Sequence, residues 1–212
     1  MAVYEVNVSL ENQAFNALLF LYAQVLGIDM RDKNIQALRA KERKHIPTVL
    51  SKEEVLLIIS NLSGIYQLLV SLMYGCGLRM QEVLNIRVKD VDFSYDKVYI
   101  FDSKFLKNRT VPLPHKLKLL LQAQVEYVEN LHKDDIQNGH GTVYMPYALE
   151  RKCPNAYKET KWQFLFPMKH VSKDPRSETI RRHYVHPQTL GRNIKEAVIK
   201  IRHSQTCYVT CF

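Results

Sequence analysis

The sequence predicts an α+β fold that is mainly helical and contains a small antiparallel sheet. Apolar residues recur at three- and four-residue steps in several stretches, the pattern of a helix with one buried face. Residues 97–101 alternate as in a β-strand and residues 110–113 form a second strand, with residues 102–109 as the connecting turn. We expect a third strand near residues 164–166. With 212 residues, 46% of them hydrophobic, the chain can bury one sizeable core.

The first helical pattern covers residues 10–25, where apolar side chains form one stripe, and Gly27 is a natural stop. One or two helices cannot bury such a stripe by themselves. We therefore interpret residues 1–30 as the remnant of an N-terminal helical domain. Residues 31–46 have the composition of a basic linker that is expected to contact phosphate. The candidate phosphate-binding residues of this linker are Arg39, Lys41, Arg43 and Lys44.

A second domain begins at residue 47 and extends to about residue 200. Ser51 and Glu54 have the spacing of a capping box, in which each side chain accepts a backbone hydrogen bond at the start of a helix. Residues 133–141 are polar and are expected to form a loop. The predicted helices of this domain cover residues 53–59, residues 66–73, a stretch from about residue 79, residues 114–131 and residues 187–201.

The chain is basic, with 30 Lys and Arg against 21 Asp and Glu, a net charge of +9 and a pI of about 9.3. Such a surface attracts polyanions, so nucleic acid is the first candidate partner. The alternative, a soluble protein that is merely basic, stays open on charge alone.

The four cysteines are scattered along the chain. Cys207 and Cys211 lie four residues apart, but no second pair of ligands stands at the spacing of a zinc finger. We expect reduced thiols, no metal site and a cytoplasmic location. Neither a signal sequence nor an apolar run of membrane-spanning length is present, so no membrane partner is expected.

Arg79 is the strongest candidate for chemistry, because it follows a glycine-rich turn at the start of a predicted helix and has Glu82 three residues on. A guanidinium there could grip two oxygens of one phosphate. Lys104 lies at the tip of the predicted hairpin, and Lys107 and Arg109 follow it. Together these groups suggest a site that binds a phosphodiester and protonates a leaving oxygen. A solvated helix arginine and an ordinary exposed turn are the alternatives.

Three strings occur in order along the chain: Tyr-Gly-Cys-Gly-Leu-Arg-Met-Gln-Glu at residues 74–82, Arg-Val-Lys-Asp-Val-Asp-Phe at residues 87–93 and Val-Pro-Leu-Pro at residues 111–114. In this order they resemble the tyrosine recombinase family, and more specifically the integron integrases. The resemblance covers about residues 7–200. Its supporting strings lie at residues 12–22, 139–141, 148–156, 162–163, 166–167, 174–177 and 181–183.

The resemblance implies the fold and chemistry of that family. Residues 1–30 would be a remnant of its core-binding domain, a SAM-like helical domain, and residues 47–200 part of its catalytic domain. Such enzymes cut DNA through a phosphotyrosyl link, which conserves bond energy and needs no cofactor. Arg79 then matches a catalytic arginine, Lys104 the lysine that protonates the leaving oxygen, and Glu82 the supporting acid. The implied partners are double-stranded and folded single-stranded recombination sites, and further integrase protomers in a tetrameric synapse.

Residues 145–186 resemble the insertion that distinguishes integron integrases and helps them to recognise unpaired bases. Aromatic and imidazole faces stack on bases at about 1–3 kcal/mol each. The alternative for Trp162 is that the only tryptophan is a core residue. The candidates are Trp162, His183 and Tyr184 for bases, and Arg176, Arg181 and Arg182 for phosphates.

The sequence also departs from the family pattern. The hairpin tip reads Ser103-Lys104-Phe105 where the family has glycines on both sides of the lysine, and a phenylalanine there strains the turn or changes its type. The His-x-x-Arg box and the nucleophilic tyrosine have no match, and Tyr208 lies too close to Arg202 to serve. We therefore expect a truncated recombinase with an aberrant tail at residues 201–212 that cleaves no DNA. The alternatives are a non-cleaving DNA-binding module and a non-functional remnant.

Overall fold

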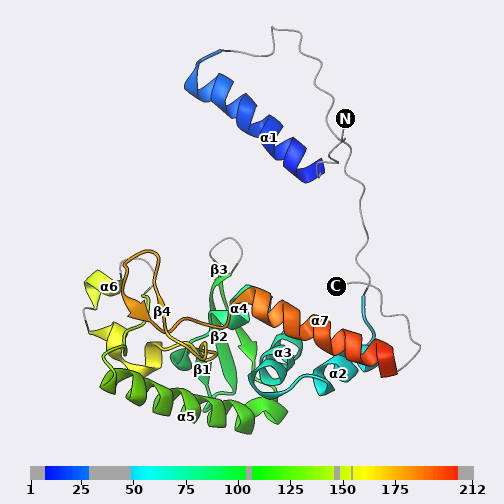
Figure 1. The fold of residues 1–212 in the computed structure, drawn as a ribbon, viewed down its shortest axis with the longest axis vertical. Helices are drawn as coiled ribbons and strands as arrows, with labels where there is room; N and C mark the ends of the chain where they lie inside the picture. The colour runs from blue at the N-terminus through cyan, green and yellow to red at the C-terminus, as the bar shows by residue number, and fades with distance from the viewer. Residues whose placement is uncertain (1–7, 29–48, 104–106, 146–148, 154, 205–212) are drawn as a thin grey trace. The chain divides into compact units, whose positions relative to one another are not determined.

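The computed structural model describes residues 8–28, 49–103, 107–145, 149–153 and 155–204 (Figure 1). Contacts divide the chain into two units, Met1–Val49 and Leu50–Phe212. In the first unit, α1 (Val8–Phe20) continues as one π-helical stretch, η1 (Leu21–Val25), which confirms the predicted helix. Several of its apolar side chains, Leu18 and Val25 among them, are exposed. The predicted linker at residues 31–46 lies outside the described residues.

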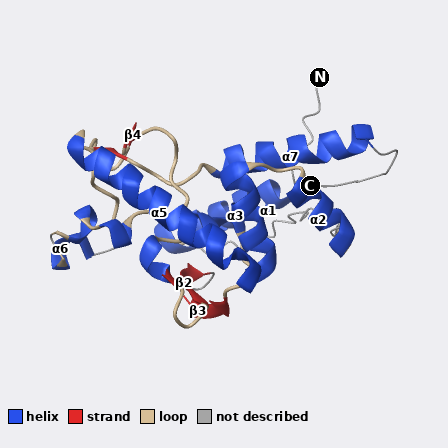
Figure 2. Cartoon of the chain, turned by 90° about the horizontal axis from the view of Figure 1, so that it is seen from below, coloured by secondary structure: helices blue, strands red, loops and turns tan. Residues whose placement is uncertain are grey.

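The second unit is rich in helices (Figure 2). Its α-helices are α2 (Lys52–Ser60), α3 (Gly64–Cys76), α4 (Met80–Leu84), α5 (His115–Gln137), α6 (Leu149–Lys152) and α7 (Pro187–Ser204). Short 3-10 helices cover Val88–Asp90, Ala156–Lys158 and Thr160–Trp162. The predicted capping box starts α2: the Glu54 amide donates to Ser51 Oγ at 3.2 Å, and the Ser51 amide donates to Glu54 Oε2 at 2.7 Å. None of the described helices is long and apolar enough to cross a lipid bilayer.

Helix α5 runs further than the sequence predicted, since it continues to Gln137 through residues expected to form a loop. Polar side chains in its last turns are buried and find partners in the fold. The His132 ring nitrogen Nε2 lies 2.8 Å from the Lys158 carbonyl oxygen, and the Asp135 carboxylate binds Arg182. Tertiary contacts therefore extend a helix whose last turns lack an apolar pattern.

The main sheet has three antiparallel strands, β1 (Val91–Asp92), β2 (Lys97–Ser103) and β3 (Lys107–Pro112), in the order β1-β2-β3. Strands β2 and β3 confirm the predicted hairpin, and they extend into the stretch that we assigned to its turn. The prediction of a third strand near residues 164–166 is wrong. Phe164 forms only an isolated bridge with Arg87, and residues 164–166 are all buried, as in a segment that crosses the core. A second, unpredicted hairpin joins β4 (Ser172–Lys173) to β5 (Ile180–Arg181).

The core of the second unit lies where α3, α4, α5 and the sheet meet. Its fully buried residues come from each of these elements, from residues 165–166 and from α7, which contributes Leu190. Helix α2 packs on α7 through a smaller cluster that contains Ile58 and Val198. This packing fixes α4 against β2, so that side chains from the helix and the hairpin can meet. Representative core residues are Leu69, Leu72, Val83, Leu84, Val98, Leu121, Leu165 and Phe166.

Candidate functional site

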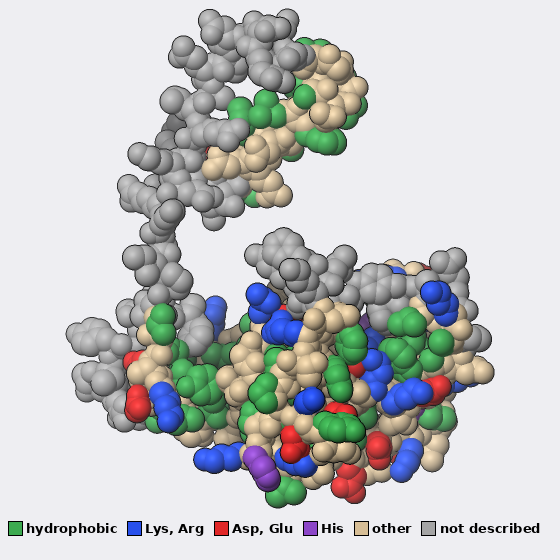
Figure 3. Space-filling model, turned by 180° about the vertical axis from the view of Figure 1, so that it is seen from behind, with side chains coloured by type: hydrophobic (Ala, Val, Ile, Leu, Met, Phe, Trp, Pro, Cys, Tyr) green, Lys and Arg blue, Asp and Glu red, His purple; other side chains and the backbone are tan. Residues whose placement is uncertain are grey.

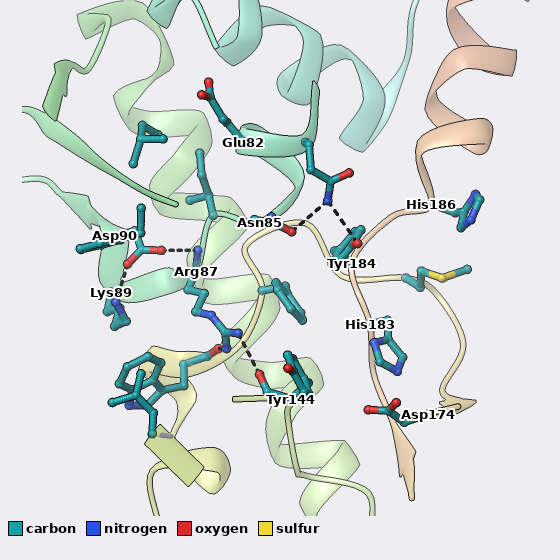
Figure 4. Close-up of a pocket in the computed structure, with 18 of the residues that line it drawn as sticks. Glu82, Asn85, Arg87, Lys89, Asp90, Tyr144, Asp174, His183, Tyr184 and His186 are labelled. Carbon is teal, nitrogen blue, oxygen red and sulfur yellow. Dashed lines mark hydrogen bonds and ion pairs between the residues drawn. The ribbon is translucent and has the colours of Figure 1, made fainter. Parts of the chain in front are cut away.

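A cavity of about 760 Å³ opens between α4, the sheet and the segment that runs from residue 144 to residue 186 (Figure 4). Four of the predicted DNA-binding residues line it, together with Glu82. On the opposite side of the molecule from that in Figure 1, Lys and Arg side chains are spread among acidic and apolar ones and form no single patch (Figure 3). The cavity is therefore a better candidate site than any charged patch on that face. The four residues are Trp162, Arg176, His183 and Tyr184.

Arg79 stands at the start of α4 because of the turn before it. Gly77 ends α3 in the left-handed region, with φ of 60°, which a glycine adopts without strain. The chain then turns, and the Arg79 amide donates to Glu82 Oε2 at 2.9 Å. The Arg79 side chain is 61% exposed, and its Nη1 donates to Glu82 Oε1 at 2.9 Å. The guanidinium thus faces solvent while one edge is held by the fold.

Glu82 is the centre of this arrangement, with a side chain only 6% exposed. Arg109 on β3 donates to both of its oxygens, from Nη1 to Oε1 at 2.8 Å and from Nη2 to Oε2 at 2.7 Å. These bonds, followed by those from Arg79, lower the pKa of Glu82 from 4.5 to about 2, against the effect of burial. The same contact raises the pKa of Arg109. Two guanidiniums around one carboxylate leave a net positive charge, which suits a phosphate.

The depressed pKa of Glu82 predicts how stability changes with pH. A carboxylate whose pKa is lower in the folded than in the unfolded protein stabilises the fold above its unfolded pKa. That contribution is lost as pH falls from 4.5 towards about 2. Urea unfolding across this range should show a loss of about 3 kcal/mol in the wild type. In Glu82→Gln this part of the pH dependence should be absent; an unchanged profile would contradict the assignment to Glu82.

Several predicted site residues are not placed. Lys104, at the hairpin tip, lies outside the described residues, as do Arg39, Lys41, Arg43 and Lys44 of the linker. Lys107 begins β3, but its side chain is not among those that the structure describes. The functions predicted for these residues stay predictions.

Trp162 lies half-buried at the cavity, with cations close to its ring. The Lys89 ammonium is 4.5 Å from the centroid of the Trp162 ring and 4.5 Å from that of Phe101. The same ammonium is 2.7 Å from Asp90 Oδ1. Sequence reasoning missed Lys89 and Phe101, although Lys89 stands within one of the strings that carry the resemblance. Only the fold brings the end of β2 to the tryptophan.

Arg87 joins this part of the cavity to the sheet. It is buried, and its guanidinium carbon lies 4.6 Å from the centre of the Phe164 ring. Nη1 donates to the Trp162 carbonyl at 2.6 Å and Nη2 to the Tyr144 carbonyl at 2.8 Å. Burial lowers the pKa of Arg87 to about 10, so the group stays charged at neutral pH. Arg87 is thus a structural cation that the sequence did not single out.

Tyr184 and His183 reach the cavity from the stretch between β5 and α7. Tyr184 Oη accepts a hydrogen bond from Gln81 Nε2 at 3.2 Å, and the tyrosine ring meets Phe164 edge-on at 5.2 Å. Figure 4 shows the His183 ring beside Asp174. His183 Nε2 is buried and has no hydrogen-bond partner among the described residues. The two predicted base-binding residues therefore lie together and share the cavity with Trp162.

The three arginines of this segment have different surroundings. Arg176 is exposed at the cavity, with its guanidinium 4.6 Å from the centre of the Tyr144 ring. Arg181 is buried beside Asp174 at 3.8 Å. Arg182 forms a forked pair with Asp135, which raises the pKa of Arg182. Both guanidiniums face carboxylates inside the protein, so their predicted phosphate contacts stay predictions.

Histidine and carboxylate side chains line parts of the cavity, but they are not grouped as metal ligands. Across the described ranges, no group of three or more His, Cys, Asp or Glu side chains is arranged to hold a metal ion. The chemistry that these residues can perform is anion binding by arginine and lysine, and stacking by aromatic rings.

The sequence is similar to known recombinases. An "Integrase/recombinase" from Escherichia coli is 37% identical over 195 residues, covering 92% of this chain and 57% of the relative, and the same values hold for one from Pseudomonas aeruginosa. "Tyrosine recombinase XerA" from Thermococcus onnurineus is 30% identical over 127 residues, covering 58% of this chain and 44% of the relative. The chain spans little more than half the length of the first two. Because the model of the Phage integrase family matches residues 48–205, well over half of the chain, the chain belongs to that family.

Proposed function

We propose that this chain binds DNA at recombination sites and supplies the phosphate-binding part of a tyrosine-type, site-specific DNA recombinase. The observation that carries the proposal is the Arg79 guanidinium, exposed to solvent and held at one edge by a buried carboxylate. An arginine fixed in this way is oriented before its ligand arrives, so less conformational entropy is lost on binding. Membership of the Phage integrase family supports DNA as the polyanion that the basic chain attracts.

The remaining donors of Arg79 suit a scissile phosphate. Glu82 accepts only one of the hydrogen bonds that the guanidinium can donate, so the other edge of the fork is available for two phosphate oxygens. In this proposal Lys104 protonates the leaving oxygen, as in the family, and no metal or other cofactor takes part. Together these groups would bind and orient the scissile phosphate.

The side chains that line the cavity suggest which form of DNA is bound. Aromatic side chains around Trp162, next to the exposed cation of Arg176, suit an unpaired base and its phosphate. We therefore propose that the DNA is a folded single strand with protruding bases, as for integron integrases, and that Trp162, His183 and Tyr184 receive such a base. Further integrase protomers would complete the synapse.

Replacing Trp162 tests this function. We expect Trp162→Ala to weaken binding to a DNA hairpin with one unpaired base by about 5- to 150-fold, the equivalent of 1–3 kcal/mol for one stacked base. Binding to the same hairpin with the unpaired base deleted should change little, because that DNA has no base to stack. Fluorescence anisotropy at constant salt measures both affinities.

The matched control is Tyr95→Ala, which removes an aromatic ring that is 73% exposed and does not line the cavity. It should leave both affinities unchanged. Thermal melting confirms that each variant is folded before binding is measured. Equal losses on the two DNAs would show that Trp162 supports the fold and does not read an unpaired base. If the wild type binds neither hairpin at low salt, the proposed function is wrong.

A further inference from the structure

We propose that Arg109 is a positioning residue that orients the Arg79 guanidinium through Glu82, and not a direct contact to phosphate. The sequence placed Arg109 with the DNA-binding cations of a hairpin, whereas its contacts point inward to a carboxylate. The inference rests on the proposed function, because it takes the Arg79 guanidinium as the group that meets the phosphate.

Each carboxylate oxygen of Glu82 accepts one hydrogen bond from Arg79 and one from Arg109. Its Oε1 accepts from Arg109 Nη1 at 2.8 Å and from Arg79 Nη1 at 2.9 Å. Its Oε2 accepts from Arg109 Nη2 at 2.7 Å and from the Arg79 backbone amide at 2.9 Å. A carboxylate offers about four acceptor directions, so this one is fully occupied. Arg109 therefore limits how far Glu82 can engage Arg79.

The two guanidiniums differ in what they leave free. Arg109 uses both of its terminal nitrogens on Glu82, and its side chain is 33% exposed. Arg79 uses one terminal nitrogen, and its side chain is 61% exposed. A bidentate grip on phosphate needs two parallel N–H groups on one edge of the fork. Arg79 keeps such an edge at an exposed position, whereas both terminal nitrogens of the less exposed Arg109 are turned inward to a carboxylate.

The backbone holds Arg109 in place. Arg109 pairs in register with Ile100 of β2, and Ile100 is buried in the core against which α4 packs. The side chain thus bridges from the hairpin to the helix that begins just after Arg79. Without Arg109, Glu82 would have free lone pairs, and Arg79 could turn its fork onto the carboxylate. The phosphate would then lose the donors that it needs.

A double-mutant cycle tests this inference, with the hairpin that carries one unpaired base as the probe. We expect Arg109→Gln to weaken binding by about 3- to 10-fold in the wild-type background. In the Arg79→Ala background the same change should cost less than about 1.5-fold, because the group that Arg109 positions is gone. Equal losses in the two backgrounds would overturn the inference.

The salt dependence in the Arg79→Ala background separates positioning from direct contact. A lost phosphate contact lowers the slope of log K against log salt by about 0.7–0.9. We expect Arg109→Gln to leave that slope unchanged, and a fall of this size would overturn the inference. Lys97→Gln is the matched control, since it removes an exposed charge from β2 that has no contact with Glu82. Its effect should be the same in both backgrounds.

Two further measurements keep the test independent of folding defects. Arg109→Lys retains the charge but not the fork, so it should weaken binding like Arg109→Gln, whereas a direct phosphate contact would tolerate lysine. In the free protein, NMR titration of Glu82 should show its pKa rising from about 2 in both variants. Failure of the wild type to bind overturns the proposed function and this inference with it. If the wild type binds normally and the effects of the two substitutions simply add, the inference is wrong but the proposed function stands.

Discussion

Asp135→Ala is expected to destabilise the second unit by about 3–5 kcal/mol, because it leaves a buried cation without its partner. Asp135 and Arg182 have side chains 10% and 11% exposed. Arg182 Nε lies 2.5 Å from Asp135 Oδ2, and Nη2 lies 2.6 Å from Oδ1. After the substitution the guanidinium would keep its hydrogen bonds to the carbonyl oxygens of Met168 and Lys169 but would have no carboxylate bound to it.

Urea unfolding at neutral pH measures this loss. Asp134→Ala is the matched control, since Asp134 is the exposed neighbour on the same turn of α5, and its replacement should cost less than about 0.5 kcal/mol. The double variant Asp135→Ala/Arg182→Met should recover part of the stability, because it removes the unpaired charge. If Asp135→Ala and Asp134→Ala unfold at the same urea concentration, the pair contributes nothing to the fold.

Arg87→Met is the second substitution with a large expected effect, a loss of stability of about 3–5 kcal/mol. The substitution leaves the carbonyls of Tyr144 and Trp162 without their donor, and hydrogen bonds to charged groups are worth about 1.5–3 kcal/mol each. It also removes the cation beside the Phe164 ring. The loss should be local, because these contacts attach the 144–164 segment to the sheet.

Hydrogen exchange distinguishes a local from a global loss. Amides of residues 143 and 165, which bond to other parts of the backbone, should exchange faster in Arg87→Met, while those of α3 change less. Arg87→Lys should not restore protection, since one ammonium cannot reach both carbonyls in the geometry of the fork. Arg192→Met removes an exposed arginine from α7 and serves as the control. A uniform increase in exchange would contradict an attachment that is local.

The features that the sequence predicted well are those whose partners lie close along the chain. The capping box of α2 joins Ser51 to Glu54, three residues apart, and Arg79 pairs with Glu82 at the same separation. The hairpin of β2 and β3 followed from alternation within two short stretches. In each case local geometry decides which groups can meet, so spacing is enough.

The features that the sequence missed depend on partners far along the chain. Arg109 meets Glu82 across 27 residues and Arg182 meets Asp135 across 47. Neither pair has a periodic signal, and both arginines read as surface cations until the fold is known. The mistaken prediction of a third strand has the same cause. A buried run such as residues 164–166 has the apolar composition of a strand, but only the tertiary contacts show that it crosses the core.

The place of Trp162 also has an optical consequence. It is the single tryptophan of the chain, and it lies at the cavity with the ammonium of Lys89 4.5 Å from its ring centre. Light absorbed selectively by tryptophan is therefore absorbed at one place in the molecule. The intrinsic emission of the protein is a label already built into the proposed base-binding site, and it reports on that site without any added dye.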